Sequence, residues 1–106
     1  MKDNYELIPN LVKHVTEIPA NSILSQTISQ DEKARYILFT FAPGEELSEH
    51  TASKQAVLYF VKGEADLTLG EDKTTAEAGT WVRMPPNLAH SIYAKTEVIL
   101  LLELIE

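Results

Sequence analysis

The segment that decides the fold runs from residue 35 to residue 63 and reads RYILFTFAPGEELSEHTASKQAVLYFVKG. It contains two short runs rich in Ile, Leu, Val, Phe and Tyr, which are Arg35–Ala42 and Gln55–Lys62. Each run ends at a Pro or Gly, and short apolar runs bounded by turn residues are typical of β-strands. The segment therefore predicts two strands joined by a polar connection.

The same pattern recurs along the chain. Five further strands are predicted: Ser22–Ser29, Glu64–Leu69, Thr80–Met84, Leu88–Lys95 and Glu97–Ile105. The breaks between them, including Gly70–Lys73 and Pro85–Asn87, are built from residues that favour turns. Asn10–Ile18 is the one segment that favours a helical turn or two. Many short strands without a long helical period predict an all-β sandwich or barrel of antiparallel sheets.

Length and composition limit the classes of function. The 106 residues form one domain, residues 1–106, without a repeat or linker. The net charge of −7 repels phosphate backbones and anionic lipid, so we expect no nucleic acid and no membrane as partner. The absence of cysteine excludes disulfides, thiolate metal sites and cysteine nucleophiles. No signal peptide or apolar run long enough to span a bilayer is present, so we expect a cytoplasmic protein.

Two groups of residues recur at fixed spacing, Gly44, His50 and Gly63 in the first and Gly79, Pro85 and His90 in the second. The two groups resemble the two motifs of the cupin family. The first motif is Gly, five residues, His-x-His, three or four residues, Glu, six residues and Gly. The second is Gly, five residues, Pro-x-Gly, two residues, His, three residues and a closing Asn. Asn87 replaces the second motif's glycine and is a residue that tolerates positive φ. The resemblance implies a double-stranded β-helix, a jelly-roll-like barrel over residues 34–105, preceded by an N-terminal segment, residues 1–20.

The chain departs from the family where the family usually binds a divalent metal. Ala52 stands at the second histidine position, Ala56 at the glutamate and Ala94 at the closing asparagine, so His50 and His90 are the metal ligands that remain. Protein sites for catalytic zinc or non-haem iron need at least three protein ligands. A divalent ion (Fe, Mn, Ni, Cu or Zn) is therefore a candidate cofactor that needs a third ligand from elsewhere. The residues considered for that role are Glu45, Glu46, Glu49, Gln55 and His14.

Alternation along the strands predicts which side chains face the pocket. Positions 50, 52 and 56 share parity, so Ala52 and Ala56 are expected to face inward with His50 if the strand is regular. By the same parity, the pocket or the core beneath it is expected to be lined by Leu58, Phe60 and Ile92. The opposite face of this strand carries Val57, Tyr59 and Val61.

Strands that are apolar on both faces need cover on both faces. Val57–Val61 and Val98–Leu102 contain no polar side chain other than the tyrosine hydroxyl, and an exposed patch of that kind is unusual on a monomer. A homodimer that buries the outer face of one sheet would cover it. The alternative is cover within one chain by Tyr5–Pro9 and Leu11–Val15.

Three functions from different classes remain open. The first is a cupin with a sensor-like or accessory role that binds a small-molecule ligand through His50 and His90. The second is a metal-dependent cupin enzyme, an isomerase, dioxygenase or decarboxylase acting on a small organic acid or sugar-like substrate. The third is a structural or interaction module with a vestigial pocket. The two alanines argue against strong metal chemistry and the two histidines against an unused pocket, so we rank the functions in this order.

Overall fold

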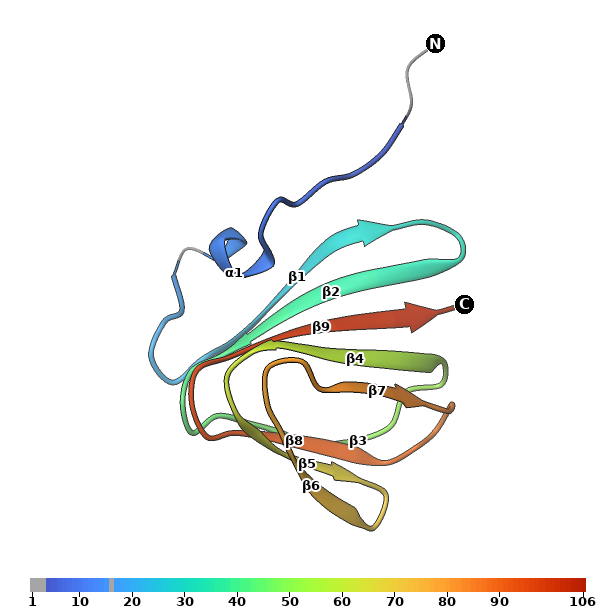
Figure 1. Ribbon diagram of the computed structural model, residues 1–106. Coiled ribbons are helices and arrows are strands. Elements are labelled where there is room, and N and C mark those ends of the chain that lie inside the picture. The colour runs from blue at the N-terminus through green and yellow to red at the C-terminus, as the bar shows by residue number, and fades with distance from the viewer. Residues whose placement is uncertain (1–3, 16) are drawn as a thin grey trace.

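The chain folds into two antiparallel β-sheets that face each other (Figure 1). The computed structural model describes residues 4–15 and 17–106. Sheet A has five strands in the order β1-β2-β9-β4-β7, and sheet B has four in the order β3-β8-β5-β6. The strands are β1 Ile23–Gln30, β2 Ala34–Phe41, β3 Glu46–His50, β4 Gln55–Lys62, β5 Ala65–Leu69, β6 Asp72–Ala76, β7 Trp81–Met84, β8 His90–Ala94 and β9 Val98–Ile105. The predicted all-β fold of two antiparallel sheets is confirmed.

All seven predicted strands are present, with ends that shift by at most two residues. Two strands, β3 and β6, were not predicted. The break expected at Gly70–Lys73 is too long, because its last two residues, Asp72 and Lys73, belong to β6. Both strands are edges of sheet B and expose most of their side chains. Edge strands of this kind need few apolar residues, so the apolar pattern that marks the other strands is absent from them.

The hydrophobic core fills the space between the two sheets. Sheet A contributes inward side chains in facing positions, such as Phe41 opposite Val98 and Leu100 opposite Phe60. Sheet B contributes Leu67 and Ile92, which are also paired and almost wholly buried. Burying one such side chain contributes roughly 1.5–3 kcal/mol, so this layer supplies most of the force that holds the sheets together.

The N-terminal segment covers part of the outer face of sheet A. Its helix α1, Leu11–His14, is capped by Asn10, whose Oδ1 accepts a hydrogen bond from the amide of Lys13 at 3.1 Å. Val15, just after the helix, lines small cavities together with Leu38 and with Ile99, two outer-face side chains that are buried. The helical turn predicted within Asn10–Ile18 is confirmed, and cover from within the chain exists at this end of the sheet.

The cover is incomplete, because Tyr5 and Leu7 of the preceding segment are 79% and 71% exposed. The expected cover by Tyr5–Pro9 is therefore wrong for these two side chains, although Glu6 of the same segment accepts a hydrogen bond from the Ser29 hydroxyl of the edge strand β1. Across the part of the chain that the structure describes, no helix is long and apolar enough to cross a membrane.

Several of the connections between strands lie together at one end of the two-sheet sandwich. The β1–β2, β3–β4 and β7–β8 connections and the C-terminus all lie there (Figure 1). Asn87 has a positive φ of 68°, as its place in the second motif predicts, and its amide donates a hydrogen bond to the Ala52 carbonyl oxygen at 2.7 Å. This bond ties the connection after His50 to the connection before His90. We call this end of the molecule the open end.

Candidate functional site

The two motif histidines lie together at the open end. His50 is the last residue of β3 and His90 the first of β8, and the two residues are directly paired across the strands. Their ring centroids lie 4.2 Å apart, with an angle of 56° between the ring planes. A β-bulge between Leu47 and His50 shifts the register of β3 and brings the two histidines opposite each other. His90 is buried, whereas His50 is exposed at the rim.

Each imidazole is fixed in one tautomer by the backbone carbonyl group of the residue two positions earlier in the chain. The Nδ1 atom of His50 lies 2.8 Å from the carbonyl oxygen of Ser48, and that of His90 lies 2.9 Å from the carbonyl oxygen of Leu88. A carbonyl oxygen can only accept, so Nδ1 carries the proton in both rings. In the neutral ring Nε2 then presents a free lone pair. The pair therefore offers two hydrogen-bond acceptors or two metal-ligand atoms.

Burial lowers the pKa of His90 below the ordinary value for an imidazole. The hydrogen bond to the Leu88 carbonyl partly opposes this effect, and a charge on His50 would lower the pKa further. A buried imidazole next to a second imidazole resists protonation, because the charged form loses its hydration and meets a like charge. His90 is therefore neutral at pH 7.

We expect acid to destabilise the fold through His90. The unfolded imidazole takes up its proton near pH 6.5, while the folded ring resists it, so stability is full above that pH and falls below it. Urea denaturation at pH 7.5 and pH 5.5 measures the loss, and most carboxylates stay ionised over this range. A His90→Gln variant should lose less stability than the parent over the same interval. Equal losses in the two proteins would show that His90 does not titrate as its burial requires.

The structure does not bring a third metal ligand to the pair. Within residues 4–15 and 17–106, no three or more side chains of His, Asp or Glu are grouped to hold a metal ion. Glu46 is paired with Tyr93 on the outer face of sheet B, and His14 lies 3.2 Å from Gln26 on the outer face of sheet A. Gln55 pairs with Ile105, also on the outer face of sheet A. The donor set of two imidazoles therefore does not fit a resident metal.

Glu45 and Glu49 give no third ligand either. The backbone of Glu45 is tied to Ala42 and Ala94, in the turn before β3 and so at the opposite end of that strand from His50. Glu49 adjoins His50 in the strand, but its side chain is exposed and belongs to no ligand group within the described ranges. The sequence motif thus supplies the pair and nothing more.

A cavity of about 320 Å³ lies at the open end, and its lining residues do not include His50 or His90. Its lining residues are Gln30, Arg35, Ala52, Ser53, Lys54, Leu104 and Glu106. Arg35 and Leu104 are opposite each other on the inner face of sheet A, so the cavity is the mouth of the space between the sheets. The Arg35 guanidinium donates to Thr27 Oγ1 at 3.1 and 3.3 Å, and it has no carboxylate partner among the described residues. Lys54 is paired with Glu106.

The predicted pocket residues separate into two groups. Ala52 lines the cavity, but it lies in the connection between β3 and β4, where alternation no longer orients a side chain. The parity argument for this position is therefore wrong. The other four pack in the buried core: Ala56, Leu58, Phe60 and Ile92. Their contact with a ligand stays a prediction.

Sequence reasoning missed Arg35 as a site residue. The signal was present, because Arg35 shares the parity of Ile37, Phe39 and Phe41 and is the one charged residue in that inward row. A lone cation among inward apolar positions marks the place where a strand leaves the core and meets a polar cavity.

Comparison with known proteins places the chain in a family. The family model described as the cupin domain matches residues 37–104. A cupin superfamily protein from Desulfitobacterium hafniense is similar over 98% of this chain and 95% of its own, with 24% identity and a TM-score of 0.84. A conserved protein of unknown function from Streptococcus pyogenes covers 98% of this chain and 90% of its own, with 22% identity and a TM-score of 0.83.

A more distant structure, KdgF from a Halomonas species, covers 94% of this chain and 96% of its own, with 14% identity and a TM-score of 0.75. No curated protein matches the sequence. At these identities the solved structures show only that the fold is shared. The family is shown by the family model, which matches more than half of the sequence. The chain belongs to the cupin family.

Proposed function

We propose that this cupin binds a small organic ligand at the open end of the barrel and uses the Nε2 atoms of His50 and His90 as hydrogen-bond acceptors. The observation that carries the proposal is the pair of Nδ1 contacts to Ser48 and Leu88. These contacts hold both rings in place and leave both Nε2 atoms free to accept from a ligand. A ligand hydroxyl is the group that matches such an acceptor.

The cavity adds a second requirement, because its lining includes the Arg35 cation, which has no carboxylate partner among residues 4–15 and 17–106. A carboxylate is the group that a guanidinium binds best, through two parallel hydrogen bonds. Ala52 joins the two parts of the site, since it lines the cavity and lies two residues beyond His50. The ligand class that satisfies both parts is a small hydroxy acid.

Titration with L-malate, succinate and D-gluconate, followed by nuclear magnetic resonance, tests this function. We expect malate and gluconate to shift the resonances of His50, His90 and Arg35, and succinate, which lacks a hydroxyl, to bind more weakly. Arg35→Ala should weaken binding by at least about tenfold, because the guanidinium–carboxylate contact is worth roughly 1.5–3 kcal/mol. A Lys13→Ala variant, altered at an exposed cation on α1, is the matched control. Shifts that avoid the open end would contradict the proposal.

We also propose that the protein is a homodimer joined through the outer face of sheet A. Leu24, Tyr59 and Trp81 on this face are 42%, 40% and 61% exposed, although the N-terminal segment covers its other end. Covering such side chains removes apolar surface from water, at roughly 25 cal/mol per Å². A second copy would cover all three.

Light scattering at low micromolar concentration is expected to give twice the 11.9 kDa mass of one chain. Tyr59→Glu should shift the mass to that of one chain and leave the His50–His90 pair intact, because Tyr59 points away from the core. Thr75→Glu, on the outer face of sheet B, is the control. A single-chain mass for the parent protein would show that the intramolecular cover is sufficient.

A further inference from the structure

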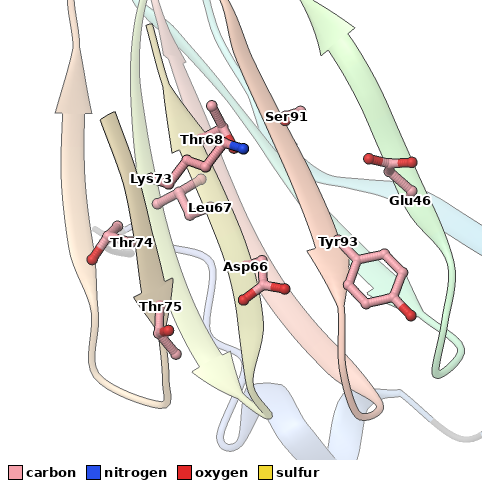
Figure 2. A pocket seen from close by; sticks show the side chains of 9 residues that line it. All are labelled: Glu46, Asp66, Leu67, Thr68, Lys73, Thr74, Thr75, Ser91 and Tyr93. Atoms are coloured by element: carbon pink, nitrogen blue, oxygen red, sulfur yellow. The ribbon is translucent and has the colours of Figure 1, made fainter. Parts of the chain in front are cut away.

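The outer face of sheet B carries a second, separate cavity of about 390 Å³ (Figure 2). Its lining comes from all four strands of the sheet: Glu46, Asp66, Leu67, Thr68, Lys73, Thr74, Thr75, Ser91 and Tyr93. Ile92 points from the same strand into the core, so this groove and the histidine pair lie on opposite faces of β8. Nothing in the function proposed above uses it.

The strand register arranges the side chains of the groove in two rows. Glu46, Tyr93, Asp66 and Thr75 are direct partners across β3, β8, β5 and β6. The second row, two residues away, contains Ser91, Thr68 and Lys73. Strands lie about 4.8 Å apart, so a row across four strands spans roughly 14 Å. This length suits an extended ligand with several polar groups.

The chemistry of the rows selects the class of ligand. Tyr93 is 42% exposed, lies between Glu46 and Asp66 in the first row, and offers the apolar face of its ring together with a hydroxyl. Its flanking groups are two carboxylates, which accept hydrogen bonds, and Thr and Ser hydroxyls, which donate and accept them. Alternating C–H faces and hydroxyls are what a sugar ring presents to such a surface.

The charges in the groove favour a neutral ligand over a charged one. Lys95 Nζ lies 3.3 Å from Asp66 Oδ1 and offsets that carboxylate. Lys73 in the second row adds another positive charge, so the two carboxylates of the groove, Glu46 and Asp66, are matched in number by two lysines. An anionic ligand would also meet the net charge of −7 on the chain.

We propose that this groove binds a neutral oligosaccharide of two or three sugar units. The Tyr93 ring packs against the C–H face of one sugar. Glu46 and Asp66 accept hydrogen bonds from its hydroxyls, and Thr68 and Thr75 bind the neighbouring unit. The site is independent of the histidine pair, so one can be lost while the other is kept.

The test is a titration of the ¹⁵N-labelled full chain with maltotriose, cellotriose and xylotriose at millimolar concentrations. At least one trisaccharide should bind saturably and shift the amide resonances of Asp66, Thr68 and Tyr93. Tyr93→Ala should weaken binding about fivefold, the effect of losing roughly 1 kcal/mol of aromatic contact. Tyr5→Ala is the matched control, because Tyr5 is a 79% exposed tyrosine in the segment before α1 and does not line the groove. This variant should bind as the parent does.

Three results would overturn the proposal. The first is the absence of saturable binding by any of the three sugars. The second is equal weakening by Tyr93→Ala and Tyr5→Ala. The third is binding of trilysine, and of no sugar, at the same amides, which would make the groove a site for basic peptides. If Tyr93→Ala does not fold, Asp66→Asn replaces it and should weaken sugar binding at least twofold while its amide spectrum stays that of the folded parent.

Discussion

Gly63→Ala is expected to destabilise the fold by at least about 3 kcal/mol, a loss that combines backbone strain with a steric clash. Gly63 joins β4 to β5 with φ of +93°, a conformation that L side chains rarely adopt. A Cβ atom at this position would lie 2.0 Å from the carbonyl oxygen of Glu97, which belongs to the backbone and cannot move aside. This close approach explains why the motif keeps a glycine here.

Gly79→Ala distinguishes backbone strain from the steric clash. Gly79 also has a positive φ, +98°, but a Cβ atom there would have no heavy atom within 4 Å. This variant should therefore lose only the strain, about 1–2 kcal/mol. Urea denaturation of both variants measures the difference. Equal losses at the two positions would mean that the contact of Gly63 with Glu97 is not as close as described.

Restoring the family pattern with Ala52→His and Ala56→Glu together is expected to create a metal site. Ala56 is 1% exposed, so a carboxylate there is buried and should destabilise the protein when metal is absent. A divalent ion held by the new residues with His50 and His90 would offset this cost, by about 4 kcal/mol at a free metal concentration of 1,000 times Kd. Stability should therefore depend on metal in the variant and not in the parent.

Thermal unfolding of the double variant with Zn²⁺ and with chelator measures this effect. A triple variant that also carries His90→Ala is the control and should lose most of the metal dependence. If Zn²⁺ does not raise the Tm of the double variant, positions 52 and 56 do not face the pair. The assignment of Ala52 and Ala56 to the motif would then be wrong.

Much of the fold could be predicted because the chain's local signals agree with its tertiary structure. The strands with buried inner faces, such as β4 and β9, carry apolar runs that mark them directly. The positive φ of Asn87 follows from its place in the second motif. Motif spacing likewise places His50 and His90 together, since both lie where a strand meets the open end.

The parts that could not be predicted depend on tertiary context. β3 and β6 are polar because each lies at an edge of sheet B, and nothing in their own sequence shows which strand each of them pairs with. Alternation does not predict the direction of the Ala52 side chain, because β3 ends at His50. The groove on sheet B combines β3, β5, β6 and β8, and its paired residues Glu46 and Tyr93 are 47 residues apart in the chain, so only the strand pairing shows it.

Metal content of the purified protein is the most direct test of whether the histidine pair acts as an organic-ligand site without a resident metal. Elemental analysis before and after mild chelation should find Fe, Mn, Ni, Cu and Zn far below one ion per chain, because two imidazoles are too few protein ligands. Malate binding should be the same before and after chelation. One tightly held ion per chain that is lost in His50→Ala would contradict this function and assign the pair to a metal-dependent enzyme.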